Sequence, residues 1–135
     1  MFYLWLNGYH KSGINDILKS CEIPKGSFYN FFETKEDYCI ATLDLYCNIM
    51  HTALEECLTD KGEKLPNRIR NFYIGQIENC IESDVIKGCY LCNISLELAN
   101  HSKKIKKELT RHHLKTNILL EKYMLEVKQK GLLNE

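Results

Sequence analysis

Residues 12–35, SGINDILKSCEIPKGSFYNFFETK, predict two short helices separated by a tight turn. The apolar residues in each helix follow the i, i+3, i+4 spacing of one buried helical face: Ile14, Ile17 and Leu18 in the first, and Phe28, Phe31 and Phe32 in the second. Pro24 suits the start of the second helix, where its missing N–H is not needed. This layout predicts a helix-turn-helix, with the apolar faces holding the two helices together.

The second helix also has a polar front. Between its phenylalanines lie small or hydrogen-bonding residues, namely Lys25, Gly26, Ser27, Tyr29 and Asn30. A helix that reads DNA needs such a front, because it must reach phosphates and base edges in the major groove. The pattern therefore favours a DNA-contacting face here over a set of aromatic residues that only fill a core.

Charge gives this interpretation no general support. The chain has 18 basic and 18 acidic residues, and residues 1–40 hold four lysines against five acidic residues. Protein–DNA affinity usually draws on a basic surface. Any DNA binding must therefore depend on a few placed contacts, and a single copy of this head would bind weakly.

The rest of the chain predicts long helices, since 135 residues contain only two prolines and seven glycines. Helical patterns cover residues 35–58, 67–82, 88–99 and 102–131, and the apolar segment 88–99 is expected to be the most buried. We expect an all-α fold, with a helix-turn-helix DNA-binding domain in residues 1–40 and a helical effector-binding and dimerisation domain in residues 41–135.

Seven cysteines could suggest a disulfide scaffold, but their odd number, the lack of a signal peptide and the helical pattern argue against one. The chain is therefore expected to be cytoplasmic, with cysteines that mostly pack as buried apolar groups. No apolar run approaches the length of a membrane span.

Cys89 and Cys92 have the C-x-x-C spacing of redox and zinc sites. No second pair exists, and the adjacent His112 and His113 point in different directions on a helix, so no metal is predicted. A sensing thiol remains an alternative. The sequence has no catalytic motif, so we predict no enzyme, no catalytic residue and no cofactor.

The motifs described above, together with Gly8-Tyr9 and residues 34–37, resemble the TetR/AcrR family of transcriptional repressors. That resemblance implies a three-helix DNA-binding head followed by a helical ligand-binding and dimerisation body. Glu22 stands in the turn where the family usually has glycine. Compared with the family, the first helix and the last two helices are reduced or missing, so the chain looks shortened at both ends.

The resemblance also implies partners: double-stranded operator DNA, a small and mostly apolar effector that releases it, and a second copy of the chain. The implied DNA contacts are Ser12, Pro24, Lys25, Gly26, Ser27, Tyr29, Asn30 and Lys35. The candidate effector-lining residues are Tyr46, Met50, Phe72, Tyr73, Gln76, Cys92, Asn93 and Tyr123. The alternatives are a binding module of the same fold that has lost DNA binding, and a cysteine-based electrophile sensor.

Overall fold

The computed structural model describes residues 1–82 and 88–132, which form seven helices and no strand. The helices are α1 (Phe2–Asn7), α2 (Ile14–Ser20), α3 (Lys25–Tyr29), α4 (Lys35–Thr59), α5 (Leu65–Glu82), α6 (Tyr90–Leu98) and α7 (Lys103–Gln129). The expected all-α fold is confirmed, and the predicted helices lie within a few residues of the observed ones. The break expected between α5 and α6 falls largely on residues 83–87, outside the described part.

The structure divides into two compact units. Among the described residues, unit 1 contains 1–47 and 88–110, and unit 2 contains 48–82 and 111–132. The long helices α4 and α7 each contribute to both units. This division is one of compactness and does not test a functional boundary between residues 40 and 41, which stays a prediction.

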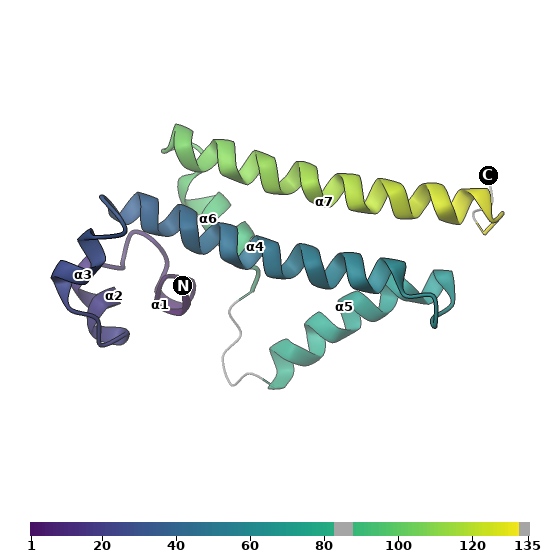
Figure 1. Cartoon of the computed structure of the whole chain (residues 1–135), viewed down its shortest axis with the longest axis horizontal. Coiled ribbons are helices and arrows are strands. Elements are labelled where there is room, and N and C mark those ends of the chain that lie inside the picture. The colour runs from purple at the N-terminus through teal and green to yellow at the C-terminus, as the bar shows by residue number, and fades with distance from the viewer. Residues whose placement is uncertain (83–87, 133–135) are drawn as a thin grey trace. The chain divides into compact units, whose positions relative to one another are not determined.

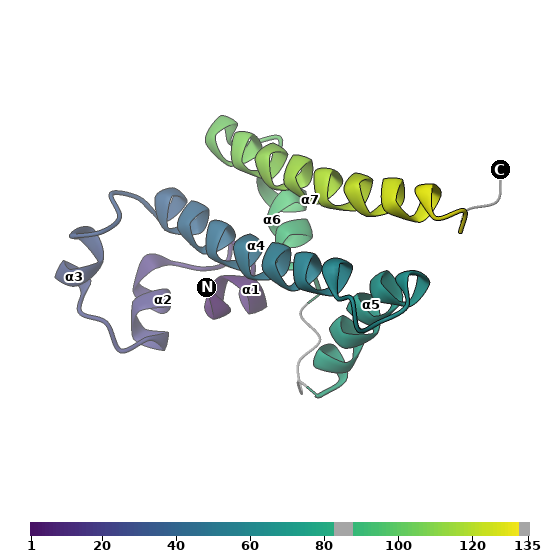
Figure 2. The same cartoon turned by 45° about the vertical axis from the view of Figure 1, so that its right-hand side comes forward.

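In unit 1, α1, α2 and α3 lie beside the first half of α4 (Figures 1 and 2). Gly8, at a φ of 77°, ends α1, because glycine accepts this left-handed region without strain. Thr34 begins α4 with a reciprocal cap: its Oγ1 accepts from the Asp37 N–H at 3.1 Å, and its N–H donates to Asp37 Oδ2 at 3.1 Å. Local sequence thus sets both helix boundaries.

The turn after α2 contains a left-handed residue at the position where the resembled family usually has glycine, since Glu22 has a φ of 55°. The Ile23 N–H donates to the Leu18 carbonyl at 3.0 Å and the Glu22 N–H to the Lys19 carbonyl at 3.3 Å. These two bonds form a Schellman motif, which satisfies the last carbonyls of the helix. A non-glycine residue in this region costs about 1 kcal/mol, which the turn tolerates.

One burial prediction was wrong. Phe31 is 81% exposed, because α3 ends at Tyr29 and Phe31 no longer continues the buried face of Phe28.

Helix α6 is buried on one face and exposed on the other. Leu96 is 87% exposed, and the face made by every fourth residue is buried. That face consists of Tyr90, Ile94 and Leu98.

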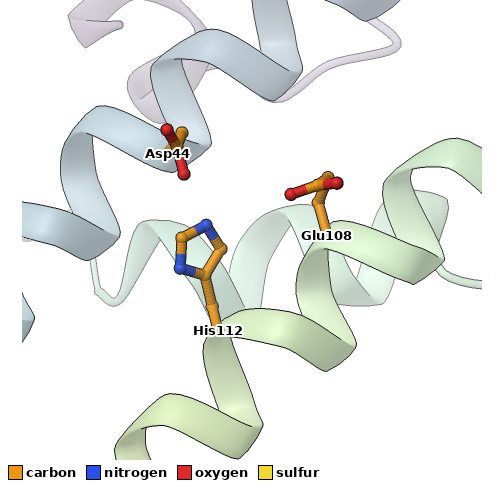
Figure 3. A group of neighbouring side chains, drawn as sticks. All are labelled: Asp44, Glu108 and His112. Carbon is orange, nitrogen blue, oxygen red and sulfur yellow. The ribbon is translucent and has the colours of Figure 1, made fainter.

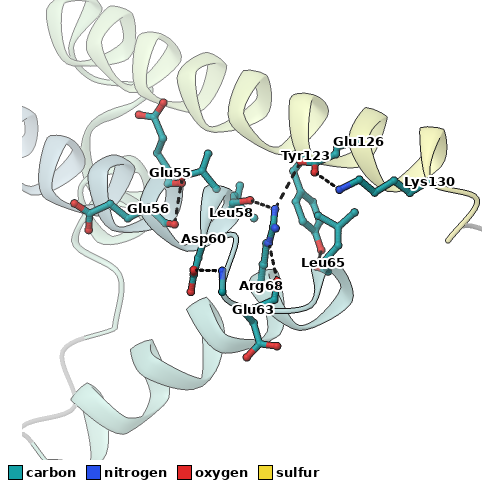
Figure 4. Close-up of polar contacts among 12 residues, drawn as sticks. Glu55, Glu56, Leu58, Asp60, Glu63, Leu65, Arg68, Tyr123, Glu126 and Lys130 are labelled. Atoms are coloured by element: carbon teal, nitrogen blue, oxygen red, sulfur yellow. Dashed lines mark hydrogen bonds and ion pairs between the residues drawn. The ribbon is translucent and has the colours of Figure 1, made fainter.

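Unit 2 has its own apolar core, made by Leu54, Leu58, Leu65, Tyr123 and Val127. Figure 4 shows how Arg68 is held beside this core. Its guanidinium donates to the carbonyls of Leu58 at 3.1 Å and Glu63 at 3.3 Å, and it lies 3.7 Å from the Glu126 carboxylate. The α4–α5 connection is therefore fastened by side chain to backbone bonds.

None of the helices in the described ranges is both long and apolar enough to cross a membrane.

Candidate nucleic-acid interface

The front of α3 is open to solvent, whereas its back is anchored. Lys25, Gly26, Tyr29 and Asn30 are exposed, and Tyr29 keeps 48% of its surface accessible. Pro24 is the N-cap residue, with extended backbone angles that turn the chain into the helix. The polar groups predicted to contact DNA at these positions are thus free of contacts that would bury them.

Three aromatic rings hold α3 to α4. Phe28 is 5% exposed, and its ring lies 5.3 Å from that of Phe32 and 5.7 Å from that of Tyr38. Phe32 and Tyr38 meet edge to face at 5.3 Å. Such pairs add about 0.5–1.5 kcal/mol each beyond area burial. They fix the orientation of a helix that is only five residues long and could not persist alone.

Gly26 has no packing reason to be glycine. A Cβ built at this position meets no atom within 4 Å, and its φ is not in the left-handed region. Because an alanine would fit the fold, any requirement for glycine must come from a molecule that approaches α3 from outside.

The side chains of Ser12 and Lys35 bond within the head, and their contact with DNA stays a prediction. Ser12 is fully buried and donates its hydroxyl to the Gly8 carbonyl at 2.6 Å. The Lys35 ammonium donates to the carbonyls of Tyr9 and Ser12, both at 3.0 Å, and lies 4.0 Å from the centre of the Tyr9 ring. Both side chains fasten the α1–α2 connection and position α2 and α4.

Ser27 is half-buried and lies at the edge of an apolar cavity of ≈ 130 Å³. The other lining residues come from α2, α3, the segments that follow them and α4: Ile17, Leu18, Cys21, Ile23, Phe28, Phe31, Phe32 and Tyr38. Ser27 is therefore less available to DNA than Lys25 or Tyr29.

The residues predicted to line an effector pocket are divided between the units. Tyr46, Cys92 and Asn93 belong to unit 1, whereas Met50, Phe72, Tyr73, Gln76 and Tyr123 belong to unit 2. Tyr123 donates its hydroxyl to the Leu65 carbonyl at 2.6 Å, and Tyr73 is 55% exposed. The cavity beside Tyr123 has a volume of ≈ 30 Å³, which is room for about one water molecule. The effector pocket stays a prediction.

The cysteines differ from the expected buried set. Cys39 and Cys47 are buried and Cys57 is half-buried, but Cys21, Cys80, Cys89 and Cys92 are exposed. Burial raises the pKa of the Cys39 thiol to about 11, which keeps it protonated. The sequence signal for the exposed pair was its C-x-x-C spacing. The many apolar residues around the pair nevertheless favoured a prediction of buried cysteines. Apolar density alone does not show which face of α6 is exposed.

Figure 3 labels Asp44 on α4 and Glu108 and His112 on α7. Asp44 and Glu108 are both in unit 1, with carboxylate oxygens within 4.8 Å of each other. His112, one helical turn after Glu108, belongs to unit 2. The three side chains therefore do not form a site within one unit, and we assign them no metal.

No protein-family model matches the chain. It is 28% identical over 104 residues to the HTH-type transcriptional repressor NemR of Escherichia coli K12, covering 77% of this chain and 52% of NemR. It is 33% identical over 104 residues to the repressor DhaR of Mycobacterium sp. GP1, covering 77% of this chain and 50% of DhaR. The chain thus spans about half the length of these curated relatives. Because the relatives are regulators, the prediction that the chain is not an enzyme is confirmed.

Two solved structures share the fold. The crystal structure of reduced Escherichia coli NemR superposes with a TM-score of 0.85 at 24% identity, over 96% of this chain and 67% of NemR. That of the regulatory protein TetR from Rhodobacter sphaeroides gives 0.89 at 24% identity, over 96% and 69%. The curated relatives and the shared fold together support the predicted regulator of the TetR family.

Proposed function

We propose that the chain acts in a transcriptional repressor by placing α3 in the major groove of double-stranded operator DNA. The observation that carries the proposal is the division of α3 into an exposed polar front and an aromatic back fixed to α4. A recognition helix needs both, because base-edge contacts require a helix whose orientation does not drift.

Each exposed residue has a role in this interface. Lys25 and Tyr29 donate to phosphate oxygens, which positions the head without reading sequence. Asn30 is the candidate for a base edge, since an asparagine amide can pair with adenine through two hydrogen bonds. Gly26 permits a close approach of the DNA backbone. Pro24 and Ser27 border the interface.

Ser12 and Lys35 support the interface from within unit 1. Their bonds to the carbonyls of Gly8, Tyr9 and Ser12 fix the connection between α1 and α2. We therefore propose a positioning role for both residues in place of direct DNA contact.

The proposed repressor works as a homodimer. Residues 1–40 have one more acidic than basic residue, so a single head gains little general attraction to DNA. Two heads spaced to meet successive major grooves, about 34 Å apart, combine two weak contacts into one strong one. Binding to chromosomal DNA would also place the protein in the cytoplasm.

A small, mostly apolar effector completes the proposal. It would bind among the body helices and favour a head spacing that no longer fits the operator, which releases the DNA. The support is the resemblance to TetR-family regulators and the half-buried aromatic Phe72, which packs against the unit 2 core. Loss of operator binding on titration with candidate apolar compounds would test this part.

The proposal as a whole is tested by fluorescence anisotropy with a labelled fragment of the DNA upstream of the chain's own gene. We expect salt-dependent binding that unlabelled upstream DNA displaces more effectively than random DNA does. A folded protein that binds neither the upstream DNA nor random DNA at low salt would contradict the proposal. That result would favour the alternative of a binding module that has lost DNA binding.

A further inference from the structure

Cys89 and Cys92 lie together where α6 begins. Cys89 is the N-cap residue, with extended backbone angles of φ −83° and ψ 121°, and Cys92 is the third residue of the helix. A side chain at the N-cap position points back over the third residue, which is why these two positions are paired in capping boxes. Both cysteines are exposed, so oxidants can reach them.

The two thiols are near neighbours, since Cys89 is among the groups that raise the pKa of the Cys92 thiol. Residues three apart at a helix start have Cα atoms about 5 Å apart. This separation lies within the range of about 4.4–6.8 Å that a disulfide requires. The pair can therefore be bridged without moving either end of the helix.

Cys89 is also tied to a cluster of aromatic rings in unit 1. The buried Tyr46 donates its hydroxyl to Cys89 Sγ at 3.6 Å. The Tyr46 ring lies 5.0 Å from the Trp5 ring and 5.7 Å from the Tyr90 ring, and Trp5 lies 5.8 Å from Tyr90. If Cys89 Sγ bonds to Cys92 in place of Tyr46, the Tyr46 hydroxyl loses its hydrogen-bond acceptor.

The same part of the chain is bonded to the helix-turn-helix head. Trp5 on α1 donates its indole N–H to the Gly88 carbonyl at 3.0 Å, directly before Cys89. On α6, the Glu97 carboxylate accepts the His10 backbone N–H at 3.1 Å. The start of α6 is thus bonded directly to α1, and the end of α6 is bonded to the connection before α2.

We propose that Cys89 and Cys92 form a reversible intrachain disulfide that acts as an oxidation switch on the head. The disulfide itself stands on the geometry of unit 1, whereas its effect on DNA rests on the proposed function. With hydrogen peroxide as oxidant, one thiolate attacks a peroxide oxygen and becomes a sulfenic acid, and the leaving hydroxide takes a proton. The second thiol attacks that sulfur and releases water. Two thiols and one peroxide thus give one disulfide and two waters.

The pair is set to react slowly at neutral pH. Partial burial, followed by the hydrogen bond with Cys89 and that neighbour's charge, raises the pKa of the Cys92 thiol above its usual value. The thiolate is the reactive form, so the oxidation rate should increase as the pH rises. The switch would then respond to sustained oxidant exposure.

The test oxidises the purified full chain with hydrogen peroxide and digests it with trypsin. Both cysteines fall in one peptide, residues 88–103, which contains no other cysteine. We expect this peptide to lose two hydrogens and to regain them with dithiothreitol. The emission of Trp5, the single tryptophan of the chain, should change with the same time course. The dissociation constant for upstream DNA should rise about tenfold, a usual size for coupling between sites.

Cys89→Ser and Cys92→Ser should each abolish all three responses, whereas the control Cys80→Ser, at another exposed cysteine, should leave them intact. Sulfinic acid or disulfide-linked dimers in place of the intrachain bond would overturn the proposal. A disulfide that forms without changing Trp5 emission would overturn the switch. If the reduced protein binds no DNA, the proposed function fails, and the mass and Trp5 readouts still decide the switch.

Discussion

Polar side chains are exposed on the front of α3 but buried and hydrogen-bonded at Arg68 in unit 2. On α3, Lys25, Tyr29 and Asn30 are exposed, and the helix is anchored by the Phe28 ring, which packs against Phe32 and Tyr38. In unit 2, Arg68 is 7% exposed and its donors are used on backbone carbonyls of the same unit. Substitutions on the front of α3 should therefore change binding without changing stability, and substitutions in unit 2 should do the reverse.

The largest effect should come from the anchor of α3. Phe28→Ala should destabilise the head by about 3 kcal/mol, at the low end for phenylalanine because the ring already borders a cavity. Phe31→Ala, at the 81% exposed neighbour, should change stability by less than about 0.5 kcal/mol. Urea unfolding followed by Trp5 fluorescence checks both. Equal losses would mean that Phe31 is also a packing residue.

Arg68→Ala should destabilise unit 2 by about 2 kcal/mol, because the carbonyls of Leu58 and Glu63 lose their donor in a buried place. The control is Arg70→Ala, on the same helix but exposed, which should have little effect. Thermal unfolding followed by circular dichroism measures both. DNA affinity measured well below the transition should be unchanged in both variants, and a selective loss in Arg68→Ala would break the contrast between the two regions.

Gly26→Ala should change folding stability and DNA affinity in opposite directions. Because a Cβ fits and alanine favours helix, the variant should gain about 0.5–1 kcal/mol of stability. The added methyl group should nevertheless weaken DNA binding, since it faces the approaching backbone. Anisotropy titration and urea unfolding on the same sample test this. Binding that is unchanged or tighter would show that the DNA backbone does not approach α3 at Gly26.

A smaller effect should appear with pH in unit 2. His51 is 4% exposed, its Nε2 lies 3.0 Å from Thr116 Oγ1, and its ring stacks 5.6 Å from that of His112. Burial first, then the nearby Lys115 and Arg111, lowers the His51 pKa below 6.5, and the His112 backbone opposes this shift by favouring the protonated ring. The folded state therefore binds fewer protons than the unfolded state, so stability should decrease as pH falls from about 7 to about 5.

His51→Gln should flatten this pH dependence, whereas His113→Gln, at an exposed neighbour, should leave it unchanged. Thermal unfolding at several pH values is the measurement. A midpoint that rises on acidification in the parent chain, or an equal response in the two variants, would rule out His51 as the titrating group.

Local sequence predicted much of the head, namely two short helices, a tight turn between them and Pro24 at the start of the second. The glycine that ends α1, the left-handed Glu22 and the Thr34 cap also depend on neighbours a few residues away. The position of Phe31 was missed because apolar spacing does not say where a short helix ends. Exposure of Cys89 and Cys92 was missed because a dense apolar segment hides which face is covered.

Long-range contacts account for the rest. Lys35 reaches the Tyr9 carbonyl across 26 residues, so the motif gave no sign that its ammonium is already bound. Arg68 did have a local signal, since it stands among the apolar positions Leu65, Ile69 and Phe72 of a helix. A charged residue at such a position is rarely buried without partners, and those partners depend on how α4 and α5 are connected.

The most direct test of the account compares three exposed α3 residues with matched exposed residues of unit 2. The variants are Lys25→Ala, Tyr29→Ala and Asn30→Ala, with Lys128→Ala, Tyr73→Ala and Asn117→Ala as their controls. Anisotropy with upstream DNA and with random DNA should show that Lys25→Ala and Tyr29→Ala weaken binding to both. Lys25→Ala should also reduce the salt slope by about 0.9. Asn30→Ala should reduce the preference for upstream DNA, by about 1–3 kcal/mol.

The three controls should bind as the parent chain does. If all six variants bind both DNAs like the parent chain, α3 does not read DNA and the central claim is wrong.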